Sequence, residues 1–134
     1  MKVNGKCHCG AIEYEATVDP AQAGVCHCID CQILSGGPFR GSVPAKAEDF
    51  HLLKGKPTLY TKTAESGRKR VQGFCGTCGS AIYATAAEDK PAIYNLRLGA
   101  VQQRREITPR RQLWCSSAMP WLKSLGDIPG VKKQ

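Results

Sequence analysis

Apolar and polar residues alternate along residues 11–18 of the chain. The apolar positions are Ile12, Tyr14, Ala16 and Val18, and the positions between them carry Glu13, Glu15 and Thr17. A period of two places one kind of side chain on each face of a strand, so this segment is predicted to be a half-buried β-strand. The pair Asp19-Pro20 is a turn signal and ends the predicted strand.

Other short segments rich in β-forming residues are separated by turn sequences. The further predicted strands are 39–43, 58–63, 70–74, 80–85 and 92–98. The turn signal Glu65-Ser66-Gly67 indicates that 58–63 and 70–74 form a hairpin. A short helix is predicted over 29–35 and is stopped by Gly36-Gly37-Pro38. The apolar tail 113–122 is predicted to dock on the core.

The composition favours one mainly β domain. A chain of 134 residues is long enough for a single domain with a modest core. The 14 glycines and 8 prolines indicate many turns between short strands. With 42% hydrophobic and 22% charged residues, the chain does not have the composition of a disordered protein. We therefore expect one domain over residues 1–134.

The net charge of +8 arises from 19 Lys and Arg against 11 Asp and Glu. Such a surface favours an anionic partner, whether a small carboxylate, an acidic peptide or nucleic acid. The basic residues form small separate clusters, and no aromatic residues alternate with them. Nucleic-acid platforms interleave basic and aromatic side chains, so the pattern argues against nucleic acid.

The N-terminal sequence lacks the apolar segment of a signal peptide. No apolar stretch is long enough to span a bilayer, so we expect a cytoplasmic protein that does not bind a membrane. The cytosol is reducing, and eight cysteines there indicate metal binding or catalysis rather than disulfides.

Two cysteine pairs far apart in sequence have the spacing of a structural zinc site. They are Cys7-x-Cys9 and Cys75-x-x-Cys78, and each pair is followed directly by a glycine. A structural zinc takes four N or S ligands, and two short pairs tie two chain segments together around it. We predict that these four cysteines hold one zinc, and that His8 faces away from it.

A second cluster, Cys26, Cys28 and Cys31, offers three thiolates within six residues. Three ligands leave one position open for a thiol or water, as in zinc sites that carry out chemistry. A closed site completed by His27, His51 or Cys115 is the alternative, with Cys115 the strongest competitor. Closely spaced thiols could also serve a redox role. The sequence thus predicts two zinc ions per chain.

The cysteine motifs resemble those of the glutathione-dependent formaldehyde-activating (GFA-type) family, which is related to centromere protein V. The matching stretches are Gly5-Lys-Cys7-His-Cys9-Gly10, Cys26-His-Cys28-Ile-Asp-Cys31, Phe74-Cys75-Gly-Thr-Cys78-Gly79-Ser80 and Pro120-Trp121, with Asp49-Phe50 and Gly55 also in place. The likeness extends over nearly the whole chain. One departure is Gln32, which stands where the family commonly carries a basic residue.

The resemblance implies a β-tent type of fold, in which several small antiparallel sheets and a few short helices surround a structural zinc. It implies that Cys7, Cys9, Cys75 and Cys78 hold that zinc and that Cys26, Cys28 and Cys31 form a second, catalytic zinc site. The implied activity is that of a carbon–sulfur lyase (S-hydroxymethylglutathione synthase type) acting on an adduct of glutathione and formaldehyde. Arg40 and the turn Ser35-Gly36-Gly37 are candidates to offset the negative charge of the thiolates.

Two other functions are compatible with the residues. The chain could be a non-enzymatic, zinc-stabilised module that binds an acidic protein or nucleic acid, with both metals structural. It could also act like a zinc-containing methionine sulfoxide reductase through Cys115, since Trp114-Cys115-Ser116 is similar to the catalytic segment of those enzymes. We expect Cys115 instead to be a small buried hydrophobe beside Trp114.

Overall fold

Three strands from the first part of the chain form the smaller of two sheets in the computed structural model, which describes residues 1–134. They are β1 (Lys2–Lys6), β2 (Glu13–Thr17) and β5 (Phe50–Lys54), in the order β1-β2-β5 and antiparallel. The strand predicted from the alternation is β2. All four apolar positions predicted to face inward are at most 5% exposed, so the assigned faces are confirmed.

The larger sheet has seven strands and contains the other predicted ones. Its order is β10 (Arg111–Leu113), β3 (Gly24–Cys26), β4 (Arg40–Lys46), β9 (Ile93–Arg97), β8 (Ala81–Ala86), β7 (Lys69–Phe74) and β6 (Thr58–Thr63). The predicted hairpin is β6–β7. All neighbours are antiparallel except β10, which runs parallel to β3. The predicted mainly β fold with antiparallel sheets is confirmed.

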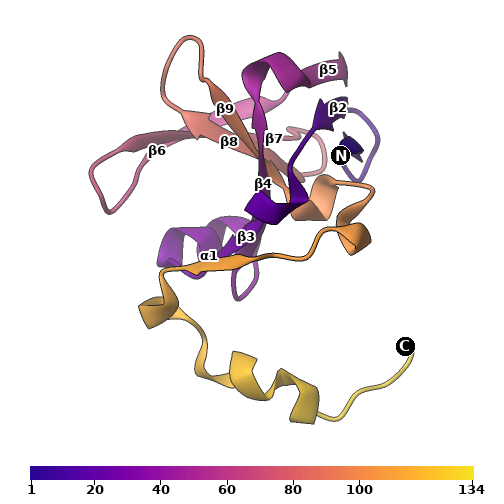
Figure 1. Cartoon of the computed structure of the whole chain (residues 1–134), viewed down its shortest axis with the longest axis vertical. Helices are drawn as coiled ribbons and strands as arrows, with labels where there is room; N and C mark the ends of the chain where they lie inside the picture. Colours follow the sequence, from indigo (N-terminus) through magenta and orange to yellow (C-terminus); the bar gives the residue numbers. More distant parts are fainter.

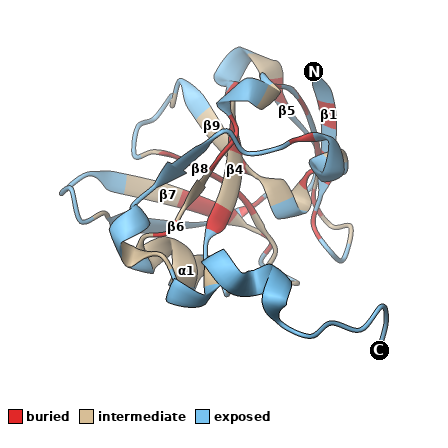
Figure 2. Cartoon of the chain, turned by 60° about the horizontal axis from the view of Figure 1, so that its bottom comes forward, coloured by how far each residue is buried: buried red, intermediate tan, exposed pale blue.

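The core lies where the two sheets face one another (Figure 1), and the buried residues gather there (Figure 2). Phe50 of the small sheet stacks on Tyr94 of β9 with the ring centroids 4.5 Å apart. The same ring meets Tyr83 of β8 edge-on at 5.6 Å and Tyr14 of β2 at 5.4 Å. Aromatic contacts therefore join the sheets at the centre of the molecule.

One short helix, α1 (Ile29–Ser35), follows β3 and occupies the predicted range. The side chain of Cys28 caps its N-terminus, and Gly36 ends it with a left-handed φ of 67°. Glycine suits this position because a side chain is strained at positive φ. The remaining helical segments are 3-10 turns, including Leu98–Ala100, Cys115–Ser117 and Pro120–Asp127.

The prediction that the tail 113–122 docks on the core is wrong. Trp114 is 46% exposed, Trp121 is 44% exposed, and Cys115 is also exposed rather than buried. The chain turns outward at Trp114, whose φ is +56°, directly after β10 has paired with the edge of the large sheet. The following 3-10 turns therefore lie away from the sheets (Figure 1).

No helix in the structure combines the length and apolar character required to span a membrane.

Candidate metal centres

The fold assembles seven of the eight cysteines into two clusters. One contains Cys7, Cys9, Cys75 and Cys78, and the other contains Cys26, Cys28 and Cys31. Within each cluster every pair of sulfur atoms lies within 4.8 Å. We call them the four-cysteine cluster and the three-cysteine cluster. Both groupings agree with the spacing argument.

The four-cysteine cluster has the dimensions of a tetrahedral zinc site. A tetrahedron with Zn–S bonds of about 2.3 Å has S···S edges of about 3.8 Å. The Sγ atoms of Cys7 and Cys9 are 3.6 Å apart, and those of Cys9 and Cys75 are 3.8 Å apart. These two pairs stand at the separation that a bound zinc would require, and the other pairs lie within 4.8 Å, so these residues fit the metal.

Two hairpin turns of equal length supply these four sulfurs. Residues 7–12 join β1 to β2, and residues 75–80 join β7 to β8. The first residue of each turn donates its N–H to the carbonyl of the last, from Cys7 to Ile12 at 3.1 Å and from Cys75 to Ser80 at 2.9 Å. Backbone hydrogen bonds therefore close both turns independently of a bound metal.

Polar hydrogens point at sulfur in both turns. The N–H of Ile12 donates to Cys7 Sγ at 3.2 Å. Ser80 Oγ accepts from the N–H of His8 at 3.0 Å, which leaves its own proton for Cys78 Sγ at 3.2 Å. This hydroxyl, followed by the backbone N–H groups of Cys9 and Ser80, lowers the pKa of Cys78 to about 5. Donors of this kind stabilise the thiolate form that binds zinc.

The three-cysteine cluster is built around the start of α1. Cys26 ends β3, Cys28 is the N-cap residue, and Cys31 lies in the first helical turn. The N–H of Cys31 donates to Cys28 Sγ at 3.3 Å, so the cap fixes the orientation of one sulfur. All three residues are partly exposed, and a small molecule can approach them from solvent.

The three sulfurs do not ionise independently. Burial opposes ionisation of Cys28, but hydrogen bonds from the Cys31 N–H and from the neighbouring thiols lower its pKa overall. Burial and the adjacent Cys28 and Cys26 raise the pKa of Cys31 to about 12. A bound dication would stabilise all three thiolates together, so this donor set also fits zinc.

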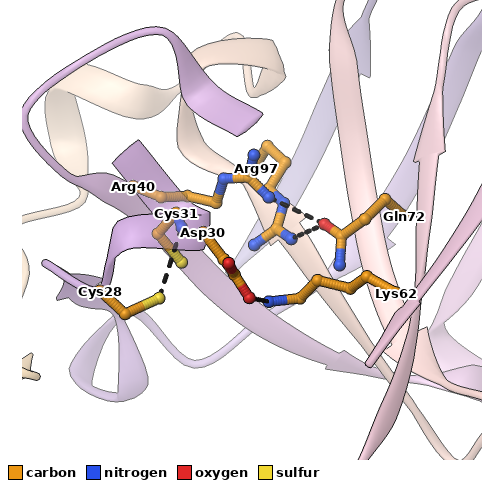
Figure 3. A network of polar contacts seen from close by, with 7 residues as sticks. All are labelled: Cys28, Asp30, Cys31, Arg40, Lys62, Gln72 and Arg97. Carbon is orange, nitrogen blue, oxygen red and sulfur yellow. Dashed lines mark hydrogen bonds and ion pairs between the residues drawn. The ribbon is translucent and has the colours of Figure 1, made fainter. Parts of the chain in front are cut away.

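Three cationic side chains lie on one side of Cys28 and Cys31 (Figure 3). Lys62 of β6 forms an ion pair with Asp30 of α1 at 2.7 Å, and its charge contributes to lowering the pKa of Cys28. Arg40 of β4 is 5% exposed. Burial lowers the pKa of Arg40, whereas the charges of the three thiolates raise it, which places the guanidinium within electrostatic reach of the cluster.

Sequence reasoning proposed Arg40 but missed Arg97, Gln72 and Lys62. These side chains come from β9, β7 and β6, which lie far in sequence from the three-cysteine cluster. Only the strand order brings them to the same place. The single available signal was that each lies within a predicted strand or at its end.

The other candidate ligands lie outside both clusters. His27 is buried, meets Phe39 edge-on, and its Nε2 lies 2.8 Å from Gln112 Oε1. His51 sits exposed in β5 of the small sheet, and Cys115 joins no cluster. Gln32 serves a local role, because its Nε2 donates to the carbonyl oxygens of His27 and Ser117 at 2.7 and 2.9 Å.

Comparison with known proteins identifies the family. No curated protein matches the sequence. A crystal structure of a Rhodobacter sphaeroides protein, solved in a structural genomics programme, is similar with a TM-score of 0.58 and 24% identity over 74% of this chain and 87% of that one, which supports the fold alone. The family model described as "Glutathione-dependent formaldehyde-activating enzyme" matches residues 2–117, which include all seven clustered cysteines. The chain therefore belongs to the GFA family.

Proposed function

We propose that the protein is a zinc-dependent enzyme of the carbon–sulfur lyase type, acting on the adduct of a thiol such as glutathione with formaldehyde or a similar small aldehyde. The observation that carries the proposal is the three-cysteine cluster, which offers three sulfurs within 4.8 Å and no fourth protein ligand. Family membership supports the choice of thiol and aldehyde. A cytoplasmic location would supply both.

Each cluster has a separate role in this proposal. Cys7, Cys9, Cys75 and Cys78 would hold a structural zinc, which in small zinc domains contributes an apparent free energy of about 10–16 kcal/mol to folding. Cys26, Cys28 and Cys31 would hold a second zinc with one position free. Zinc bound there would keep a substrate thiol deprotonated at neutral pH.

The cations near the three-cysteine cluster would offset the negative charge of the thiolates in such a site. Three thiolates exceed the charge of a zinc dication by one, and a substrate thiolate raises the excess to two. Arg40, Arg97 and Lys62 supply compensating positive charge close to the sulfurs. In a partly buried site this compensation is far stronger than it would be in bulk water.

The reaction is balanced without a redox cofactor. The thiolate sulfur forms a bond to the carbonyl carbon of formaldehyde, and the C=O π electrons move to the oxygen. That oxygen takes up the proton that the thiol lost, which gives the S-hydroxymethyl adduct. The reverse direction breaks the same C–S bond and releases thiol and aldehyde.

Exchange NMR with formaldehyde and glutathione tests the activity. We expect the zinc-loaded protein to accelerate adduct formation above the uncatalysed rate, which must be measured in parallel because thiols and aldehydes combine unaided. Cys28→Ser should abolish the acceleration, since it removes one of three ligands. Equal rates with the wild-type protein and Cys28→Ser would refute the proposed enzyme.

X-ray absorption at the zinc edge distinguishes this proposal from a non-enzymatic binding module. With both sites loaded, we expect a mean sulfur count below four per zinc, rising when glutathione is added. Four protein sulfurs at every zinc would instead favour a module in which both metals are structural. Cys115→Ser provides a control, because Cys115 lies outside both clusters and its loss should leave the zinc content unchanged.

A further inference from the structure

Two arginines of the large sheet converge on one neutral acceptor. Arg40 Nη1 donates to Gln72 Oε1 at 2.8 Å, and Arg97 Nη2 donates to the same oxygen at 2.7 Å (Figure 3). Neither guanidinium forms an ion pair, because the only ion pairs in the structure are Lys46–Glu48 and Lys62–Asp30. Two like charges are thus held together in a partly buried place with no carboxylate bonded to either, and the thiolates of the three-cysteine cluster are the negative groups that act on them.

This arrangement leaves hydrogen-bonding capacity unused. A guanidinium has five N–H donors. Arg97 Nε is buried and has no partner at all. Burial, and after it the charge of Arg40, lowers the pKa of Arg97 to about 9, while the thiolates of Cys31 and Cys26 oppose the shift, so the group is cationic at neutral pH. Buried polar groups are normally hydrogen-bonded, and free guanidinium donors at a cavity can bind the oxygens of an anionic ligand.

The two guanidinium groups line a cavity of about 610 Å³ that extends from Leu34 and Ser35 near α1 to Gly79 and Ser80 beside the four-cysteine cluster. Lys6 and Arg104 also line it, and none of its 16 lining residues is acidic. The cavity therefore presents four cations and no anion. Its size is that of a site for a small organic molecule.

We propose that Arg40 and Arg97 form a carboxylate-binding site that holds a carboxylate group of the substrate beside the three-cysteine cluster. Arginine is the side chain best suited to this, because its planar donors match the two oxygens of a carboxylate. Arg40 lies directly opposite Cys26 in the β3–β4 ladder, so the site adjoins the sulfurs. A thiol that carries a carboxylate, as glutathione does, could reach both at once.

The carboxylate-binding site, called the anion site below, is inferred from the arginine pair alone. Assigning its ligand to the thiol substrate rests on the proposed function. The carboxylate could alternatively belong to the electrophile, as in an aldehyde acid. S-methylglutathione distinguishes these sources, because it keeps both carboxylates of glutathione but has no ionisable thiol. Glyoxylate provides the carboxylate of an aldehyde acid without any thiol.

Gln72→Glu is the decisive variant. The change is close to isosteric and places an internal carboxylate on both guanidinium groups, so it should raise the melting temperature while blocking the site. Calorimetric titration of the zinc-loaded protein should show S-methylglutathione binding at least tenfold more weakly to Gln72→Glu than to the wild-type protein. The diester of S-methylglutathione should bind the wild-type protein at least tenfold more weakly than the free acid.

Arg105→Met is the matched control, because it lowers the net charge by one unit, as Gln72→Glu does. Arg105 is exposed and does not line the cavity. It should bind S-methylglutathione within twofold of the wild-type protein. If only glyoxylate binds, and Gln72→Glu weakens it, the anion site is supported and its ligand is the electrophile. Equal binding by the wild-type protein and Gln72→Glu, or binding of neither probe, would overturn the proposal.

The outcomes separate this inference from the proposed activity. The titrations involve no reaction, so the anion site can be confirmed even if formaldehyde exchange is not accelerated. Conversely, if exchange is accelerated but Gln72→Glu binds S-methylglutathione as tightly as the wild-type protein does, the proposed activity would be supported and the anion site would be refuted. The Gln72→Glu melting temperature shows that any loss of binding is not caused by unfolding.

Discussion

The glycines that follow the cysteine pairs are required for their backbone conformation. Gly79 has a φ of +76° and Gly10 a φ of +78°, and a Cβ atom at either position would meet no atom within 4 Å. The cost of a side chain there is thus conformational and not steric. A non-glycine residue in the left-handed region is less stable by about 1–2 kcal/mol.

Gly79→Ala should therefore lower the free energy of unfolding by about 1–2 kcal/mol, measured by urea denaturation at a fixed zinc concentration. Gly99→Ala is the control, because Gly99 also has open space around it but no positive φ. That substitution should leave stability unchanged or slightly raise it. An equal loss in both variants would mean that the left-handed turn is not the cause.

Site residues differ in how far the sequence alone could identify them. The cysteines could be grouped from spacing, because metal ligation requires particular atoms at short separations. Arg97 and Gln72 could not be identified as partners from the sequence, because an arginine and a glutamine in strands form no distinctive sequence pattern. Their role depends on three-dimensional placement by β9 and β7, which periodicity does not specify.

At the level of secondary-structure elements, the pairing of β1 with β2 leaves no space for a side chain at Gly5. Gly5 lies opposite Tyr14 in the antiparallel ladder, and a Cβ atom on Gly5 would overlap the Tyr14 ring. Tyr14 is fully buried and packs on Phe50, so the ring cannot move aside freely. Overpacking of a dense core costs about 1–3 kcal/mol and sometimes more.

We expect Gly5→Ala to destabilise the protein by at least about 1–3 kcal/mol, seen as a lower urea midpoint. Asn4→Ala tests the opposite face of the same strand, where the side chain is exposed. That variant should change stability by less than about 0.5 kcal/mol, as is usual for surface sites. Unchanged stability of Gly5→Ala would show that β1 can shift away from β2.

Local patterns predicted β2, α1, the β6–β7 hairpin and also β4, β8 and β9, but they failed for β1 and for the tail 113–122. β1 was missed because its sequence, KVNGK, has only one large apolar residue, and its pairing partner β2 makes it a strand. The tail was misassigned because apolar composition alone indicated burial. Its 3-10 turns are too short and irregular to present one continuous face, and Trp114 turns the chain outward.

At the level of the whole molecule, the two cysteine clusters link segments that differ in their separation along the sequence. The four-cysteine cluster joins the β1–β2 turn of the small sheet to the β7–β8 turn of the large sheet, with Cys9 and Cys75 separated by 66 residues. The three-cysteine cluster spans only Cys26 to Cys31, within one local segment. Loss of the four-cysteine cluster would remove a link between the sheets, while loss of the three-cysteine cluster would affect mainly the start of α1.

Stepwise removal of zinc should follow this difference, and the buried members of the four-cysteine cluster predict its order. Cys9 of the four-cysteine cluster is exposed, but Cys7 and Cys75 anchor that cluster in the core at 1% and 2% exposed, whereas no member of the three-cysteine cluster is buried. Native mass spectrometry during chelator titration should show one zinc leaving first with the β-sheet circular dichroism retained. Departure of the second zinc should coincide with unfolding, because a structural zinc supplies about 10–16 kcal/mol.

Two variants separate the sites without a chelator. Cys31→Ser should fold and carry one zinc, because its site contributes little to joining the sheets. Cys75→Ser should be unfolded or strongly destabilised, since it breaks the link between the small and large sheets. A folded, zinc-free Cys75→Ser protein would contradict this, and it would mean that the aromatic contacts of Phe50 with Tyr83 and Tyr94 hold the sheets together without metal.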